Sequence, residues 1–289
     1  MDKNFVKNIM EKLSFPSDAY DELFRTLDVL NKVGDFENII EKYNNCSIDF
    51  TQSIEQVKLL ALEENCCVYT AYMLYLLFLT PQLKKMYSEN GISEEIFYDT
   101  ISDLRYKLDE CRLVHNACGT FVPIWYKGIF EMKIFALGRL QFELNNIWFD
   151  CKINGKYIPK ETKILSVHIP RTGKPLLHEL VIDSYNQAKM FFRNEFNNEI
   201  IFVCNSWLLD PWNRTVLNDN SNLAQFFDDF TIVQTGNYKD YSETWRLFDC
   251  LYNNPDELPN NSSLRRAYIE RIKSRQPTGY GTGVIVMNI

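Results

Sequence analysis

The spacing of hydrophobic positions divides the chain into two parts with different periods. In the first part, apolar residues such as Leu23, Leu27 and Leu30 recur every three to four positions, which is the period of an amphipathic helix. Ser17 or Asp18 can cap the first of these helices. The predicted helices cover residues 17–34, residues 51–79 as one helix or a broken one, and residues 93–119. This part contains no alternating segment, and it therefore predicts a small helical bundle.

The most apolar window of the chain lies in the second of these helices, which the pattern ends before Pro81. This window covers residues 68–80. A helix needs about 20 apolar residues to cross a bilayer. The window is therefore too short to span a membrane, and it predicts a buried helix.

The pattern changes after about Cys118. Residues 139–144 alternate between polar and apolar side chains, which predicts a half-buried strand. The pair Asn154–Gly155 between two β-prone runs predicts a hairpin over residues 147–158. Further strands are predicted over residues 163–169, 200–206, 230–236 and 281–289, and helices over residues 124–138, 176–192, 207–217, 240–252 and 261–275.

The order of these elements predicts an α+β protein of two domains. Residues 1–118 form the N-terminal helical domain, and residues 119–289 form a mixed sheet flanked by helices. A strand, a helix and a strand follow one another between Lys163 and Cys204, which implies one parallel pair of strands.

Charge and cysteine usage narrow the class of protein. The net charge of −7 argues against a general nucleic-acid binder, which would usually be basic. The eight cysteines contain no C-x-x-C pair and only three histidines are present, so we expect no metal site. The first residues are charged and amphipathic rather than a secretory signal. We therefore expect a cytoplasmic protein with free thiols.

Four stretches carry a resemblance to a known family. The segments FALGRLQFEL, SVHIP, FVCNSWLLDP and SSLRRAYIERI together resemble a bacterial family of acyltransferase-domain proteins. In that family a helical N-terminal domain precedes a domain like the GNAT N-acyltransferases. The resemblance covers most of the chain. It implies transfer of an acyl group from acetyl-CoA or another acyl-CoA to an unidentified amine, without a metal and without a covalent enzyme intermediate.

The same resemblance implies a place for the coenzyme. In GNAT proteins a loop and a helix after a central strand hold the pyrophosphate, and the next strand splays away to admit the pantetheine arm. Residues 163–170 would be the central strand and residues 200–206 the splayed neighbour. The candidate coenzyme-binding residues are His168, Ile169, Arg171, Thr172, Gly173, Lys174, Asn205, Ser206 and Trp207.

The loop of residues 171–175 has the chemistry of a phosphate site. A helix N-terminus offers unpaired N–H groups and a partial positive charge. Gly173 allows close approach of the backbone, and Arg171 and Lys174 add positive charge. Pro175 suits a first helical turn. The alternative is an ordinary connection between a strand and a helix.

Two residues are alternatives for the proton acceptor that acyl transfer to an amine needs. Glu143 lies on the polar face of its strand, together with Arg139, and His168 ends another strand. Each has a structural alternative: Glu143 in an ion pair with Arg139, and His168 in a hydrogen bond to a neighbouring segment. Cys204 lies in an apolar strand, which favours core packing over a nucleophilic role.

Residues 205–207 have more than one possible role, and they bear on whether the protein is an enzyme. Asn205, Ser206 and Trp207 could hydrogen-bond pantetheine or the acyl carbonyl, and Ser206 could cap the following helix. The family pattern has a His at the position of Asn205, and GNAT phosphate loops are richer in glycine than this one. These two departures favour a second hypothesis, a non-catalytic coenzyme A-binding or protein-interaction module.

Overall fold

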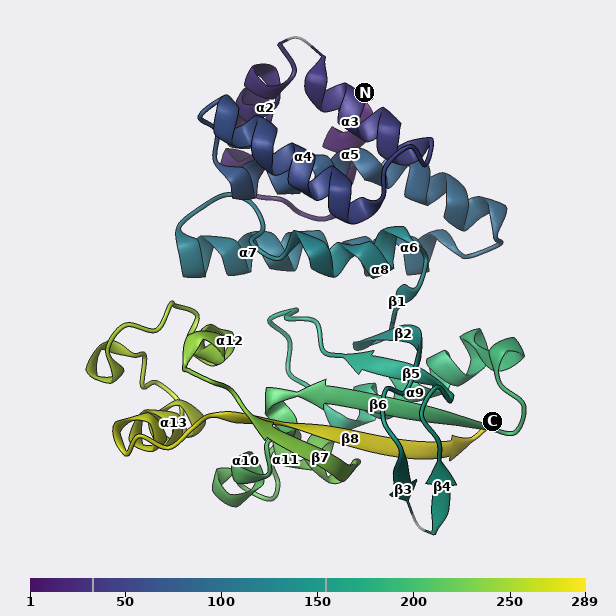
Figure 1. Ribbon diagram of the computed structural model, residues 1–289, viewed down its shortest axis with the longest axis vertical. Coiled ribbons are helices and arrows are strands. Elements are labelled where there is room, and N and C mark those ends of the chain that lie inside the picture. Colours follow the sequence, from purple (N-terminus) through teal and green to yellow (C-terminus); the bar gives the residue numbers. More distant parts are fainter. Residues whose placement is uncertain (33, 154) are drawn as a thin grey trace. The chain divides into compact units, whose positions relative to one another are not determined.

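The computed structural model describes residues 1–32, 34–153 and 155–289. The chain divides into two compact units, Met1–Phe135 and Ala136–Ile289 (Figure 1). The first unit is helical and the second contains a mixed six-stranded sheet, so the α+β class expected from the sequence is confirmed. The sequence pattern changes near Cys118, and the internal contacts divide the chain after Phe135.

A long helix forms the centre of the first unit. Residues 70–80 of α5 are all buried, and α5 contacts the other long helices of the unit. A helix that is apolar on every side belongs in a core, as the sequence predicted for this window. Among the described residues, no helix is both long enough and apolar enough to cross a membrane. The helices of this unit are α1 Lys3–Lys12, α2 Ser17–Leu30, α3 Asp35–Asn44, α4 Phe50–Glu63, α5 Val68–Glu89, α6 Glu94–Ile101, α7 Asp103–His115, η1 Pro123–Tyr126 and α8 Lys127–Phe130.

The expected end of a helix before Pro81 is wrong, because α5 continues through this proline to Glu89. Proline has no N–H to donate to the carbonyl four residues earlier, here that of Leu77. The Thr80 hydroxyl donates to the Leu77 carbonyl oxygen at 2.6 Å instead. The side chain of Thr80 thereby satisfies the carbonyl group that Pro81 leaves without its usual donor.

Two other expectations for this unit need correction. The stretch 51–79, predicted as one helix or a broken one, is two helices, α4 and α5, whereas the predicted single helix 93–119 is α6 and α7 with Ser102 between them. Ser93 caps α6, since its hydroxyl accepts from the amide of Ile96. Neither Ser17 nor Asp18 caps α2, because the helix already begins at Ser17. The periodicity of hydrophobic residues does not reveal these short interruptions between helices.

The second unit is built around one sheet with the strand order β1-β2-β5-β6-β8-β7. Its β5 and β6 are parallel, as the strand–helix–strand pattern predicted, while the pairs β2–β5, β6–β8 and β7–β8 are antiparallel. The predicted helix 124–138 is wrong in its second half, which forms β1. The strands are β1 Ile134–Leu137, β2 Leu140–Asn146, β3 Cys151–Ile153, β4 Lys156–Ile158, β5 Lys163–His168, β6 Glu199–Ser206, β7 Thr231–Asn237 and β8 Gly279–Asn288.

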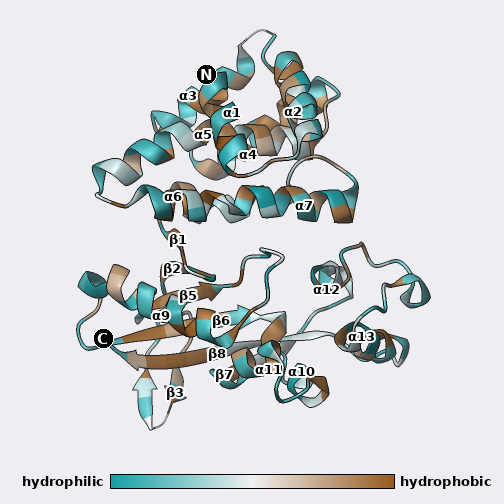
Figure 2. Cartoon of the chain, turned by 180° about the vertical axis from the view of Figure 1, so that it is seen from behind, coloured by the Kyte–Doolittle hydropathy of each residue, from teal (hydrophilic) through white to brown (hydrophobic). Residues whose placement is uncertain are grey.

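Helix α9 covers one face of the sheet. Tyr185 of α9 packs against Phe142 of β2 and Phe202 of β6, with ring centroids 6.2 and 5.0 Å away. Hydrophobic residues are concentrated on β5, β6 and β8 (Figure 2). The remaining helices of this unit are α9 His178–Phe191, η2 Arg193–Glu195, η3 Trp207–Leu209, α10 Pro211–Val216, α11 Asn222–Asp228, η4 Ser242–Thr244, α12 Trp245–Phe248, η5 Pro255–Glu257 and α13 Ser263–Lys273.

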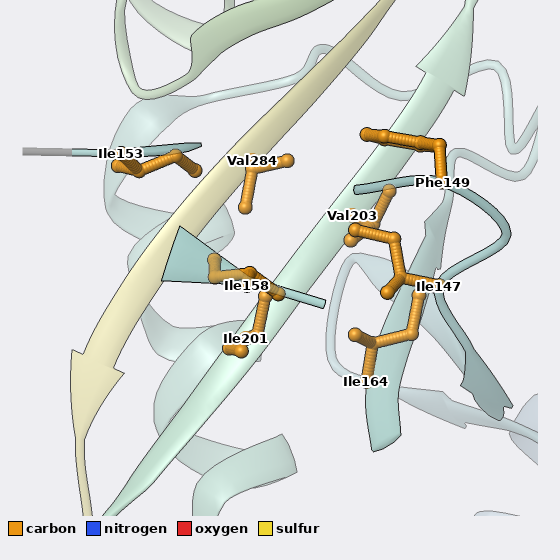
Figure 3. Packing of buried hydrophobic residues seen from close by; sticks show 8 residues of the cluster. All are labelled: Ile147, Phe149, Ile153, Ile158, Ile164, Ile201, Val203 and Val284. Carbon is orange, nitrogen blue, oxygen red and sulfur yellow. The ribbon is translucent and has the colours of Figure 1, made fainter. Parts of the chain in front are cut away.

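The hairpin β3–β4 lies over part of the opposite face. Ile153 and Ile158 of the hairpin pack with Ile201 of β6 and Val284 of β8 in one buried cluster (Figure 3). The paired strands confirm the predicted hairpin, whereas Asn154 of its predicted turn lies outside the described residues. The apolar part of this face is thus covered at one end, toward the start of β5 and β6.

Candidate active site

The strand register brings three of the predicted site residues, Glu143, His168 and Asn205, onto one face of the sheet. Glu143 of β2 lies opposite Ser166 of β5, and Ser166 is paired with Val203 of β6. His168 and Asn205 follow two residues after Ser166 and Val203. Because paired residues share a face and side chains alternate along a strand, all of these side chains project from the same face.

A hydrogen bond joins the two candidate bases. Nε2 of His168 lies 3.1 Å from Oε2 of Glu143, and 26% and 24% of their side chains are exposed. A carboxylate on one ring nitrogen fixes the tautomer and the orientation of an imidazole, and imidazole exchanges protons near neutral pH. The sequence treated Glu143 and His168 as alternatives, and the structure brings them together as one pair open to solvent.

Strands β5 and β6 part beside this pair. Their pairing covers only Leu165 with Phe202 and Ser166 with Val203. Beyond this point β5 stays paired with β2 as far as His168, and β6 stays paired with β8 as far as Ser206. Each strand therefore follows its outer neighbour. The end of each strand keeps a backbone edge that its parallel partner does not cover.

The loop after β5 carries Arg171 into an ion pair that the sequence did not reveal. An Nη2 of Arg171 lies 2.5 Å from Oδ1 of Asp249, and Arg265 lies 2.6 Å from the other carboxylate oxygen. Asp249 follows α12 with a left-handed backbone, and Arg265 belongs to α13. The three residues tie the loop to the segment between β7 and β8. Asp249 is distant in sequence and lies in no motif, so sequence reasoning had no signal for it.

The rest of the loop keeps its backbone accessible. Gly173 has a φ of 73°, a conformation that favours glycine, and a Cβ at this position would meet no atom within 4 Å. The amide of Lys174 donates to the Thr172 hydroxyl at 3.1 Å. Lys174 forms no ion pair among the described residues. Pro175 lies before the helix and not in its first turn as expected, because α9 begins at His178.

The residues at the end of β6 are anchored in three different ways. Asn205 is exposed, and its Nδ2 donates to the Thr282 hydroxyl of β8 at 2.9 Å. Ser206 caps the short helix η3, since its hydroxyl accepts from the Leu208 amide at 3.2 Å. Trp207 is partly buried and contacts Tyr268 of α13 edge to face. Asn205 presents its side chain on the face that carries His168 and Glu143, whereas Ser206, the next residue of β6, projects from the other face.

Cys204 has none of the features of a nucleophile. Its side chain is 1% exposed, and burial raises the pKa of its thiol to about 12. The thiolate, which is the reactive form, is therefore rare at neutral pH. The core role expected for this residue agrees with its burial.

A buried ion pair fixes the turn that follows β6, and no sequence pattern predicted it. Asp210 and Arg271 are 8% and 7% exposed, and Oδ2 of Asp210 lies 2.6 Å from Nη1 of Arg271. Oδ1 of Asp210 accepts from the amide of Trp212, and the guanidinium of Arg271 lies over the Trp212 ring. Helices α10 and α13 are thereby joined beneath the end of β6.

No candidate metal centre occurs in the described part of the chain, where no three His, Cys, Asp or Glu side chains are grouped to hold an ion. The side chains of this site can accept protons and donate hydrogen bonds.

Comparison with known proteins identifies the family. A family described as the N-acyltransferase N-terminal domain matches residues 4–132, and one described as the GNAT-like C-terminal domain matches residues 134–285. A search of curated proteins finds no match to the sequence.

Solved structures of acyltransferases share the fold of the chain. One, a mutant in complex with octanoyl-CoA, has a TM-score of 0.77 at 20% identity, over 99% of this chain and 88% of that one. Another, in complex with decanoyl-CoA and teicoplanin, has a TM-score of 0.73 at 20% identity, over 97% of this chain and 87% of that one. A third, in complex with decanoyl-CoA, has a TM-score of 0.66 at 19% identity, over 99% of both chains. The resemblance seen in the sequence is confirmed, and the chain belongs to the family that joins an N-acyltransferase N-terminal domain to a GNAT-like C-terminal domain.

Proposed function

We propose that this protein is an acyltransferase that transfers the acyl group of an acyl-CoA to an amine, with the Glu143–His168 pair as the proton acceptor. The observation that carries the proposal is the position of this pair. It lies on the open face of the sheet, at the point where β5 and β6 part.

The parting of β5 and β6 supports a position between them for the pantetheine arm. Pantetheine is a chain of amide groups, which can hydrogen-bond to an uncovered strand edge as an added strand does. The edge of β6 between Cys204 and Ser206 is uncovered on the side of β5. A donor lying along this edge would bring its thioester toward His168. The pyrophosphate would then meet the loop of residues 171–175, where Gly173 leaves space beside the backbone.

The reaction needs one proton acceptor and one hydrogen-bond donor. The amine nitrogen attacks the thioester carbonyl carbon, the C–S bond breaks, and CoA leaves as a thiolate. The pair takes the proton that the amine loses, directly or through one water, and this proton can then neutralise the thiolate. The amide of Asn205 is a candidate donor to the acyl carbonyl oxygen, because its side chain shares the face of the pair. No step requires a covalent intermediate, in agreement with the burial of Cys204.

The proposal extends to the length of the acyl group and to the kind of acceptor. The similar structures hold octanoyl-CoA and decanoyl-CoA, and one of them also holds teicoplanin. These ligands favour a medium-chain acyl-CoA over acetyl-CoA as the donor. They also make teicoplanin a useful member of a panel of amine acceptors.

One observation favours the second candidate, a module that binds coenzyme A without catalysis. The resemblance implies a His at the position of Asn205, and the amide that stands there cannot accept the amine proton. The Glu143–His168 pair supplies an acceptor from neighbouring strands, and for this reason we favour the enzyme.

The test is a transfer assay on the whole chain. Release of the CoA thiol and the mass of the acylated product are followed with acetyl-, octanoyl- and decanoyl-CoA against a panel of amines that includes teicoplanin. We expect equal amounts of free thiol and amide product with at least one acceptor. Binding of acyl-CoA without amide formation by any acceptor would favour the non-catalytic module, and absence of acyl-CoA binding would contradict both candidates.

A further inference from the structure

Arg139 is held in a turn that packs against helix α9. It lies between β1 and β2, directly after Gly138, whose φ is 70°. The amide of Arg139 donates to the Ser184 hydroxyl of α9 at 2.7 Å. A Cβ on Gly138 would lie 2.7 Å from the same oxygen, so the close approach of this turn requires glycine. The position of the Arg139 backbone is thus set by α9.

The guanidinium of Arg139 binds three backbone carbonyl groups of the loop after β5. Its Nη1 donates to Pro170 at 3.0 Å, its Nη2 to Lys174 at 3.1 Å and its Nε to Pro175 at 3.3 Å. Pro170 directly precedes the candidate phosphate segment of residues 171–175, and Lys174 and Pro175 are its last two residues. The planar donor fork of arginine can hold several acceptors at once, which the single ammonium group of lysine does less well.

Peptide geometry converts these contacts into an orientation of the loop amides. The chain contains no cis peptide bond among the described residues, and in a trans peptide the C=O and the following N–H point in opposite directions. The Pro170 carbonyl turned toward Arg139 therefore turns the Arg171 amide away from it. The Pro175 carbonyl does the same for the Leu176 amide. Neither amide has an acceptor in the described part of the protein.

We propose that Arg139 is a positioning residue for the phosphate groups of the acyl donor. It draws the negative ends of three peptide dipoles to one side of the loop and so presents the amides of Arg171 and Leu176 on the other side. It acts through these amides and does not bind the phosphate groups itself. The inference rests on the proposed function, because it assumes that an acyl-CoA is the ligand.

A role limited to folding would have a different signature. If Arg139 only stabilised the loop, its loss would disturb every ligand that lies on this face. If Arg139 orients amides toward phosphate, its loss would weaken the binding of only those ligands that carry the pyrophosphate. Coenzyme A and pantetheine differ in this part of the molecule, and they share the arm that would lie between β5 and β6.

The experiment compares Arg139→Met and Arg139→Lys with the whole wild-type chain. Arg193→Met is the matched control, because Arg193 is exposed in η2 and its substitution makes the same change in net charge. Calorimetry gives the Kd for coenzyme A and for pantetheine, and steady-state assays give KM and kcat for the acyl-CoA. We expect Arg139→Met to raise the Kd for coenzyme A by about tenfold to a hundredfold. Pantetheine affinity and saturating kcat should stay near the wild-type values.

Each outcome decides the inference. The Kd of Arg139→Lys for coenzyme A should lie between those of the wild type and Arg139→Met. If Arg139→Met does not fold, Arg139→Lys is the variant that tests the inference. Equal loss of affinity for coenzyme A and pantetheine, or no loss for either, would overturn the positioning role. The proposed function would still stand. If the wild-type chain itself binds no coenzyme A, the proposed function fails and the role of Arg139 fails with it.

Discussion

At the scale of single residues, the Glu143–His168 pair determines what chemistry this face of the sheet can perform. Removing a general base commonly costs about 10²- to 10⁴-fold in rate. We therefore expect His168→Asn to lower kcat within this range and to leave the Kd for coenzyme A unchanged. Glu143→Gln keeps the shape of its side chain but not its charge, and it should lower kcat by a similar or smaller factor.

Glu257→Gln is the control for this pair, since Glu257 is exposed and belongs to η5. It makes the same chemical change elsewhere in the second unit and should keep full turnover. Full turnover in both His168→Asn and Glu143→Gln would rule out the pair as the proton acceptor.

The Asp210–Arg271 pair makes a prediction about stability at the same scale. Arg271→Met leaves the buried carboxylate of Asp210 without its cation, and such a loss costs about 3–5 kcal/mol in the free energy of unfolding. The control is Arg246→Met, because Arg246 pairs with Glu243 at the surface, with 42% and 36% of their side chains exposed. It should cost about 0–1 kcal/mol. Chemical denaturation of both variants measures the difference, and equal costs would contradict a structural role for the buried pair.

At the scale of elements, helix α5 shows how one hydroxyl group allows a proline inside a buried helix. Thr80→Val removes the donor to the Leu77 carbonyl and should cost about 1–3 kcal/mol. In a Pro81→Ala background, Thr80→Val should cost less free energy of unfolding, because the restored amide of residue 81 can donate to that carbonyl. A double-mutant cycle measured by denaturation tests this coupling. An equal cost of Thr80→Val in both backgrounds would contradict it.

The elements with strong local signals were predictable from the sequence. The apolar window of residues 68–80 predicted the buried part of α5, and the strand–helix–strand run after Lys163 predicted the parallel pair β5–β6. The end of α5 was not predictable, because the compensation at Pro81 depends on a side-chain rotamer. The second half of the predicted helix 124–138 forms β1, where pairing with β2 outweighs local periodicity.

The sequence predicted which residues belong to the candidate site better than it predicted the contacts between them. Glu143 and His168 were identified from residue type and strand position, but their hydrogen bond depends on the register of β2 against β5. The partners of Arg171 and Arg139 were not predictable. Asp249 reaches Arg171 from the segment between β7 and β8, and Arg139 binds carbonyl groups that carry no sequence signal.

At the scale of the whole molecule, the two units have different kinds of core. The helical unit is organised around α5, and the second unit around a sheet covered by α9 on one face and by the hairpin β3–β4 on part of the other. The family match covers both units, whereas all the residues of the proposed site come from the second. Fold alone does not establish an activity, so the account depends on where the donor binds.

The most direct measurement is a crystal structure of the whole chain with an unreactive analogue of an acyl-CoA. The account predicts that the pantetheine arm lies between β5 and β6 and that the pyrophosphate contacts the amides of the loop after β5. It also predicts that the reacting carbonyl lies within reach of the Glu143–His168 pair, directly or through one water. A ligand bound away from the parting strands, or a carbonyl beyond the reach of the pair, would contradict the account.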